Sequence, residues 1–340
     1  MIFKRLLRLI KKYFIFRKLN KISFTSPLSS PHYLEIEPTV QCNLKCIFCS
    51  RLNGDVSRTK TDLTPEDIDK ILNLFPNLKY VSLQGLGETF LNRNLEEIME
   101  KLKKHNIVTW SLTNGTLLNK KSVRDIIHKY FFDIGISIDS VDPQKASELR
   151  PGGPDLNQVF KGVTTLIKER EAGKSNIFVG LNVTVSHENY QELPLIGDMA
   201  VKLGVDYILL INIENWFTVC EDGYKKAKEF THEASKYTVQ IDNAVQQLRA
   251  RIRFSPVIVR HSPSTKRIGN CIWPFSSMFI ASDGEVSPCC IRMHTNNYPI
   301  GNIHNCKNIS EIWHGKQYTE LRQAHIKKDK DNFICGQCPQ

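Results

Sequence analysis

The sequence predicts an α/β protein in which a parallel sheet of strand–helix repeats is followed by a small cysteine-rich unit. Six apolar runs alternate with amphipathic helical segments between residues 33 and 213, the pattern of a parallel βα-repeat sheet. Three cysteines follow the first run, and a second cysteine group lies near the carboxyl end. We expect four segments: an amino-terminal helix and linker (1–32), the βα-repeat domain (33–223), a helical connector (224–267) and the cysteine-rich unit (268–340).

Length and composition narrow the class of protein. The chain has 340 residues, of which 41% are hydrophobic, so it can bury a sizeable core. No apolar run approaches the roughly 18 residues of a membrane span, and the amino terminus lacks the small-residue cleavage site of a signal peptide. Ten clustered cysteines in a chain of this length indicate metal binding rather than disulfides. We therefore expect a cytoplasmic metalloprotein.

The positive charge is concentrated at the amino terminus. The formal net charge is +11, and residues 1–22 hold eight basic side chains and no acidic one, which leaves about +3 for the rest. The body of the protein is thus nearly balanced, and nucleic acid is not an expected partner. The basic residues are Lys4, Arg5, Arg8, Lys11, Lys12, Arg17, Lys18 and Lys21.

Residues 2–19 are expected to form a basic amphipathic helix, because apolar side chains recur at helical spacing on one face. Two interpretations are equally open. The helix through residues 1–22 can rest on an anionic membrane surface, which would place the protein peripherally at the inner face of the membrane. Alternatively, it docks on the body of the protein. Residues 23–32 are rich in Ser and Pro and predict a linker.

Start and stop signals delimit the elements of the repeat domain. Thr64-Pro65-Glu66 is typical of an N-cap followed by proline at the first helical position, and Gly173 and Gly204 follow expected helix ends. We expect a long polar helix over 224–253 and a connector over 255–266. The expected strands are 33–40, 79–84, 107–112, 132–138, 177–185 and 207–213, and the expected helices are 65–75, 95–105, 121–129, 157–171 and 190–203.

The first cysteine group is the most informative motif. Cys42, Cys46 and Cys49 have the spacing CxxxCxxC on the loop after the first strand. Three thiolates can hold three irons of a cubane iron–sulfur cluster, which ordinarily takes four, so one iron would remain open. The alternatives are a zinc knot or buried thiols. Zinc prefers four protein ligands, and the sequence offers no fourth donor nearby, which favours the open cluster.

With Phe48 just before the third cysteine, this motif resembles that of the radical SAM superfamily. The resemblance implies a partial (β/α)6 TIM barrel and a [4Fe–4S] cluster on the three cysteines. In that family the open iron binds S-adenosylmethionine (SAM), and one electron cleaves SAM to release a 5′-deoxyadenosyl radical. A reductant such as flavodoxin or ferredoxin is implied as a partner. The cofactor thus supplies the chemistry, and the protein positions it.

The loop after the second strand, Gly85-Leu86-Gly87-Glu88, is similar to the GGEP segment that contacts the methionyl amino group of SAM in this superfamily. Thr89 replaces the usual proline. Two glycines allow a backbone to approach a ligand closely. An ordinary turn between strand and helix is the alternative.

Ser137 and Arg150 resemble, in place and spacing, a serine and an arginine that hold the SAM carboxylate in anaerobic sulfatase-maturing enzymes. Arginine suits this role because its planar fork can bind both oxygens, while the alternative is a surface arginine. Asn182, Asn212 and Glu214 could also face the barrel interior, although no motif identifies them.

The second cysteine group comprises Cys271, Cys289, Cys335 and Cys338. The Asp-Gly turn at 283–284 predicts a hairpin that brings the first two together, and the closing CxxC adds two thiolates. A zinc site with the same four ligands is the alternative. The arrangement resembles the SPASM/twitch extension of radical SAM enzymes, which implies one auxiliary [4Fe–4S] cluster, with Cys290 as the alternative to Cys289. Cys220 and Cys306 match no motif.

Taken together, the resemblance implies an oxidoreductase whose radical removes a hydrogen from a substrate carbon while the auxiliary cluster accepts an electron. Only about 32 residues precede the barrel, which is too few for the leader-binding domain of many peptide maturases. This favours a small polyol or sugar-like substrate. The alternatives are a peptide- or protein-modifying maturase and a membrane-docked iron–sulfur or zinc scaffold. No motif identifies a catalytic residue.

Overall fold

The structure, a computed structural model, describes most of the chain between residues 27 and 335. The amino-terminal helix expected over 2–19, Glu214, Cys220 and Cys338 lie outside the described residues. The structure describes residues 27, 29–49, 51, 58–153, 155–213, 232–233, 235–262, 271–290, 293, 300–329 and 335.

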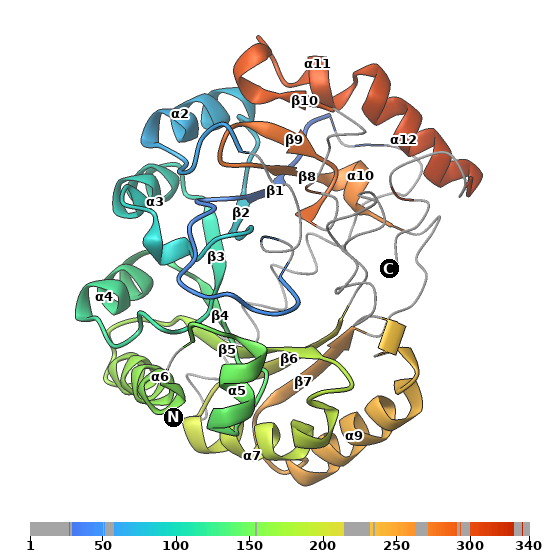
Figure 1. The fold of residues 1–340 in the computed structure, drawn as a ribbon. Coiled ribbons are helices and arrows are strands. Elements are labelled where there is room, and N and C mark those ends of the chain that lie inside the picture. The colour runs from blue at the N-terminus through green and yellow to red at the C-terminus, as the bar shows by residue number, and fades with distance from the viewer. Residues whose placement is uncertain are drawn as a thin grey trace.

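Six parallel strands form the barrel wall, as the sequence predicts, and they neighbour one another in chain order (Figure 1). Most of the helices that follow these strands lie outside this curved sheet. The strands are β1 (Tyr33–Ile36), β2 (Tyr80–Leu83), β3 (Val108–Thr113), β4 (Asp133–Ser137), β5 (Phe178–Val185) and β6 (Tyr207–Asn212). The helices between them are α2 (Pro65–Leu74), η1 (Thr89–Leu91), α3 (Leu95–Lys104), α4 (Lys121–Tyr130), α5 (Pro143–Leu149), α6 (Leu156–Glu171), η2 (Tyr190–Glu192) and α7 (Leu193–Leu203).

The predicted helix boundaries follow local capping chemistry. The Thr64 hydroxyl accepts a hydrogen bond from the backbone N–H of Asp67, whose carboxylate accepts one from the N–H of Thr64 at 2.7 Å. This capping box satisfies two of the donors that a helix start leaves open. Helix α7 ends at Gly204, which adopts φ = 76°, a conformation that glycine accepts without steric penalty.

The connector differs from the expectation. A seventh strand, β7 (Ile258–Ser262), pairs parallel with β6 in a region expected to be an irregular connector. Val257, Ile258 and Val259 form a β-branched run typical of a strand, but the flanking Pro and Ser residues favoured a connector in the prediction. Within the described part of the predicted long polar helix, the structure has α9 (Thr238–Arg251), which packs against α7.

The cysteine-rich unit continues the same sheet. Strand β8 pairs parallel with β1, and β9 pairs antiparallel with β8, so the predicted hairpin at Asp283-Gly284 is confirmed. Gly284 has φ = 85°, as this turn requires. The elements of this cap are α10 (Trp273–Ser276), β8 (Ser277–Ile280), β9 (Glu285–Ser287), β10 (Gly301–Asn302), η4 (Ile303–Asn305), α11 (Ser310–Trp313) and α12 (Lys316–Lys327).

The two faces of the barrel sheet differ in burial. Side chains that face the helices, such as Ile36, Leu83 and Leu210, are 0% exposed and belong to the main core. By strand alternation, Leu112 and Leu209 face the other side, the lumen, and they are only half-buried. Ser82 and Phe178, which also face the lumen, are 0% exposed, so the lumen is accessible to solvent only in part.

The amino-terminal part of the lumen holds stacked aromatic rings. The ring of Tyr33 lies 5.2 Å from that of Trp110 and 5.5 Å from that of Trp273 between centroids. Such offset pairs contribute beyond the area they bury. Strands β1 and β3 and helix α10 are thus joined across the interior.

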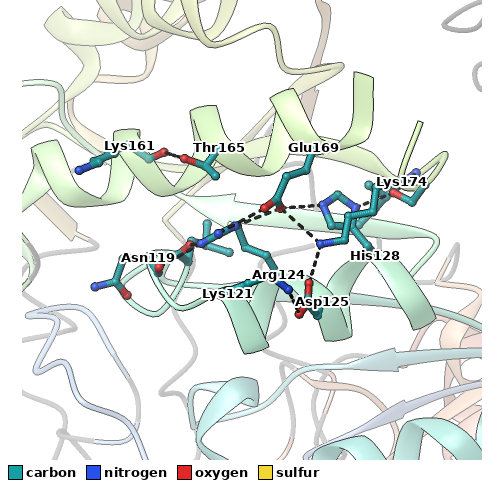
Figure 2. Close-up of polar contacts among 12 residues, drawn as sticks. Asn119, Lys121, Arg124, Asp125, His128, Lys161, Thr165, Glu169 and Lys174 are labelled. Atoms are coloured by element: carbon teal, nitrogen blue, oxygen red, sulfur yellow. Dashed lines mark hydrogen bonds and ion pairs between the residues drawn. The ribbon is translucent and has the colours of Figure 1, made fainter. Parts of the chain in front are cut away.

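On the outside of the barrel, Glu169 of α6 forms ion pairs with side chains of α4 (Figure 2). Its carboxylate contacts Arg124 at 3.1 Å, His128 at 3.1 Å and Lys174 at 4.0 Å. Burial lowers the pKa of His128, although Glu169 opposes this shift. This network holds α4 and α6 together on the barrel wall.

In the described part of the chain, every helix falls short of the length and apolar content that crossing a membrane requires.

A buried ion pair between Arg170 and Asp206 anchors β6, since Asp206 also accepts the N–H of Val179 at 2.9 Å. Asp206→Ala should lower the free energy of unfolding by about 3–5 kcal/mol, because Arg170 loses its buried partner and keeps only the less buried Glu171. Chemical denaturation followed by circular dichroism measures this. The matched control is Asp198→Ala, which breaks an exposed pair with Arg251 and should have a much smaller effect. Equal losses in both variants would contradict the prediction.

Candidate cluster and cofactor site

The three-cysteine loop is held against the segment that follows α5. The backbone N–H groups of Lys45 and Ile47 donate to the carbonyls of Pro151 at 2.8 Å and Leu149 at 3.0 Å. The thiols of Cys42, Cys46 and Cys49 are half-buried. Because the loop leaves the carboxyl end of β1, it lies at the end of the barrel where βα proteins place their chemistry.

The glycine-containing loop after β2 packs directly on the chain that enters the cysteine loop. A Cβ atom on Gly87 would clash with the carbonyl oxygen of Thr39 and lie 2.6 Å from that of Gln41. The N–H of Glu88 donates to the same Gln41 carbonyl at 2.7 Å. Gly87 is therefore required for this close approach, and the loop supports the cysteines.

The Glu88 carboxylate faces the turn after β3. It accepts hydrogen bonds from the Thr113 hydroxyl at 2.7 Å and the Asn114 N–H at 2.8 Å, and burial raises its pKa. The Asn114 side-chain amide donates to Asn43 at 2.9 Å and lies 4.0 Å from the sulfur of Cys42. Glu88 thus supports the cysteine loop through Asn114, and its predicted contact with SAM stays a prediction.

The thiols of this loop are protonated before metal binds and would release their protons on binding it. Burial raises the pKa of Cys46 to about 11 and also raises that of Cys49, while Arg150 opposes both shifts. A thiol must lose its proton to bind metal. Among the described residues, no three His, Cys, Asp or Glu side chains surround a point that one ion could occupy.

Arg150 is a buried residue, so the surface-arginine alternative is wrong. Its guanidinium Nε donates to Asp139 Oδ2 at 2.7 Å, and its Nη2 contacts the same oxygen. Asp139 Oδ1 in turn accepts the N–H of Thr184 at 2.8 Å. The guanidinium lies 6.0 Å from the centre of the Phe48 ring, which places it beside the cysteine loop.

Ser137 ends β4 on its lumen face and pairs in register with Asn182 of β5. The buried amide oxygen of Asn182 has no hydrogen-bond partner within the described ranges, and it would touch a Cβ on Gly135. Such an unsatisfied oxygen is a candidate ligand contact. Asn212, by contrast, alternates to the helix side, where it bonds His261 at 2.9 Å.

A buried carboxylate joins this site to the cap. Glu37, which follows β1, accepts Arg58 Nε at 3.1 Å and the N–H of Leu86 at 2.9 Å. Arg58 also contacts Glu285 of β9 at 3.1 Å. The loop after β2 and the cap hairpin are thus held by one group of charges.

The two adjacent cap cysteines have different surroundings. Burial raises the pKa of Tyr318 well above its usual value; the charge of Arg322 opposes this shift, and the thiols of Cys289 and Cys335 both add to it. Cys290 instead packs with Leu86 and Phe279 on the lumen side. Its backbone N–H donates to the buried Glu35 at 3.0 Å.

The other proposed auxiliary ligands are less fully described. Cys271 is half-buried just before α10, whereas Cys338 lies beyond the described residues. Cys306, which matched no motif, is buried. Its sulfur lies 3.5 Å from the carbonyl oxygen of Ile303 in the same turn.

Sequence reasoning did not single out Asn114, Asp139 or Glu37 as parts of the site. Asn114 lies in the Thr-Asn-Gly turn after β3, and Asp139 lies just after β4. Their position at carboxyl ends of barrel strands was a usable signal. No feature of the sequence marks Glu37 in this way, because only the tertiary structure brings Arg58 and the cap next to it.

Two family models match the chain. Residues 36–193 match the radical SAM superfamily, and residues 271–339 match SPASM, an iron–sulfur cluster-binding domain. The two matches together cover about two thirds of the chain.

Named proteins also resemble the chain over most of its length. A tungsten-containing aldehyde ferredoxin oxidoreductase cofactor-modifying protein of Pyrococcus furiosus is 26% identical over 319 residues, covering 85% of this chain and 83% of that protein. The antilisterial bacteriocin subtilosin biosynthesis protein AlbA of Bacillus subtilis is 26% identical over 325 residues, covering 91% and 67%.

Among solved structures, Streptococcus suis SuiB bound to S-adenosylmethionine has a TM-score of 0.70 at 20% identity and covers 92% of this chain and 71% of its own. SuiB has also been crystallised with its precursor peptide SuiA. At this identity the likeness shows a shared fold, and the expected partial TIM barrel with a SPASM cap is confirmed.

The different surroundings of Cys289 and Cys290 generate a test. Cys289→Ser should remove the iron of the second site, about four atoms per chain, because Cys289 is buried like Cys335 and both thiols act electrostatically on Tyr318. Cys290→Ser is the matched control and should keep that iron. Iron analysis and the visible absorption of anaerobically reconstituted protein measure both. Iron loss from the Cys290 variant alone would reverse the assignment.

Proposed function

Because the chain belongs to the radical SAM superfamily and carries its SPASM domain, we propose that it uses a SAM-derived radical to modify a peptide or protein. The observation that carries this proposal is the geometry of the mouth of the barrel. A three-cysteine loop and the buried Arg150–Asp139 pair lie together there, next to a partly accessible lumen.

Cys42, Cys46 and Cys49 would hold a [4Fe–4S] cluster, and their loop is preorganised for it by the bonds to Leu149 and Pro151. When bound, this cluster supplies the electron that cleaves SAM into a radical able to take hydrogen from a substrate carbon. The chain's own residues bind and orient SAM. A flavodoxin or ferredoxin is the proposed reductant.

Arg150 is the proposed partner of the SAM carboxylate. Asp139 holds the guanidinium through Nε and Nη2, which fixes the plane of the fork. Within the described structure, Nη1 remains available for a second carboxylate, that of SAM. Ser137, on the adjacent strand end, would add a hydroxyl donor, and the backbone around Gly85 and Gly87 would meet the amino group.

The chemistry of the lumen favours a peptide over a polyol. The half-buried lumen side chains of β3 and β6 include Leu112, Leu209 and Ile211, which cannot bond hydroxyl groups. A polyol would need a polar partner for each hydroxyl that loses water, whereas these residues suit the apolar parts of a peptide.

Two of the similar proteins support the same substrate class. AlbA is named for the biosynthesis of a bacteriocin, and SuiB binds a precursor peptide. The named relatives give no support to the polyol or sugar-like substrate that the sequence favoured. That preference rested on the few residues before the barrel, which are no measure of what the lumen accommodates.

Cys271, Cys289, Cys335 and Cys338 would hold the auxiliary cluster. Such a cluster would supply an acceptor for the electron that remains on the substrate once a hydrogen atom and a proton have left. Glu35 and Glu37 link this cap to β1 through Cys290 and through Arg58 with Glu285. They would therefore hold the acceptor at a fixed place beside the lumen.

Arg150→Ala should weaken SAM binding roughly ten- to hundredfold, because a charge-assisted contact is lost. Asp139→Asn should weaken it less, since the arginine stays but is less firmly oriented. Equilibrium dialysis with anaerobically reconstituted protein measures the dissociation constant. Arg251→Ala, which removes an exposed arginine of α9, is the control and should bind SAM normally. Unchanged affinity in the Arg150 variant would remove this residue from the site.

The function itself is tested with reduced, reconstituted protein and SAM. Wild type should form 5′-deoxyadenosine, and the variant Cys42→Ala/Cys46→Ala/Cys49→Ala should form none while it keeps about half of roughly eight irons. Surviving cleavage would overturn the assignment.

The substrate class is tested with deuterated forms of short peptides whose reading frames lie beside the gene. Deuterium should appear in 5′-deoxyadenosine, and mass spectrometry should detect a modified peptide. Deuterium transfer from polyols but from no such peptide would contradict the proposed substrate.

A further inference from the structure

Strand β7 ends the barrel sheet and has an open backbone edge. It pairs only with β6 in the described structure, and the N–H of Ile258 donates to the Asp206 carbonyl at 3.1 Å. In a parallel pair, alternate residues bond to one neighbour and the residues between them point their backbone groups the other way. Val259 and His261 therefore direct theirs outward, where no backbone partner is found within the described ranges.

This edge is more exposed than the strands of the barrel wall. Ile258 is 36% exposed, and Phe254, which precedes the strand, is 89% exposed. Arg260 is exposed as well, and Arg253 lies 4.5 Å from the centre of the Phe254 ring. Proteins usually cover or blunt such an edge, because it is a template for another strand.

The edge is continuous with the lumen. Ile258 and Arg260 pair in register with Tyr207 and Leu209 of β6, which face the interior. In Figure 1, β7 lies beside β6 at the end of the barrel sheet, across the interior from the cap. A strand added to β7 would direct every second side chain toward the same interior.

We propose that the open edge of β7 binds an extended segment of the peptide substrate as an additional strand. This inference rests on the proposed function, and it identifies where that substrate docks. Main-chain hydrogen bonds to Val259 and His261 would provide affinity, and side chains at alternate positions would provide specificity. Arg253 and Arg260 favour a segment that carries acidic side chains.

The charge of the edge argues against a second copy of this chain as the occupant. Two β7 strands paired about a twofold axis would bring Arg260 near Arg260 of the other copy. Like charges on facing strands are destabilising. An acidic peptide meets the same residues with complementary charge.

The chain offers a variant that closes the edge without breaking the ladder to β6. In Val259→Pro, the outward N–H is replaced by a ring, and the bonds of Ile258 and Arg260 to β6 remain. Proline is tolerated at such outward positions of edge strands. The matched control is Val259→Ala, which also removes the branched valine side chain but keeps the N–H.

The probe is a short capped peptide of alternating valine and glutamate, and its affinity for full-length reconstituted protein is measured by fluorescence anisotropy. Val259→Pro should weaken binding about tenfold or more through the lost backbone contacts, and Val259→Ala should bind like wild type. A probe with every second amide methylated should bind weakly to all three proteins, and a lysine-for-glutamate probe should bind more weakly than the acidic one.

Equal affinity of wild type and Val259→Pro, or no binding by wild type at millimolar peptide, would overturn the docking site. Wild-type dimers that dissociate in Val259→Pro would assign the edge to self-association instead. SAM cleavage without peptide, measured on the same samples, tests the proposed function separately. The rate of SAM cleavage should be equal in all three proteins. If wild type does not cleave SAM, the proposed function is wrong, whereas the result of the binding experiment still stands.

Discussion

The arrangement of the site depends on one buried carboxylate, that of Glu37. It is 0% exposed, and it binds the Arg58 guanidinium and the backbone of Leu86. Removing one partner of such a buried pair costs about 3–5 kcal/mol. Because Arg58 also reaches Glu285 in the cap, the same charges fix the loop after β2, the return from the cysteine loop and the β8–β9 hairpin.

Buried charge pairs recur wherever the barrel must hold a loop in one place. Asp139 fixes Arg150 beside the cysteines, and Asp206 fixes Arg170 at the start of β6. Each aspartate also accepts a backbone N–H from β5, that of Thr184 or of Val179. Pairs of this kind contribute little net stability over apolar packing, but they penalise any other arrangement strongly. The main effect of these buried pairs is therefore to keep the loops of the site in one arrangement.

The sequence was most informative where one local signal decides the structure. Alternation predicted β1 to β6, capping predicted α2, and the Asp-Gly turn predicted the cap hairpin. Strand β7 was not predicted although Val257-Ile258-Val259 is a β-branched run, because the Pro and Ser residues on both sides favoured a connector. In the site, too, the local signals were the informative ones. The cysteines are adjacent in sequence and could be recognised, whereas the pairing of Arg150 with Asp139, and of Glu37 with Arg58 and Glu285, required contacts between distant segments.

The pairing of β8 with β1 has a consequence for how the protein is made. Tyr33 pairs with Ser277, and Ile36 pairs with Ile280, so the strand that leads into the cysteine loop lacks one neighbour until four fifths of the chain has left the ribosome. Contacts this far apart in sequence form late, after the local ones. During synthesis the three thiols are thus present long before their loop is fully supported. A finished site for iron and sulfur therefore exists only after β8 has been synthesised, and until then the three thiols lie on a loop that lacks part of its support.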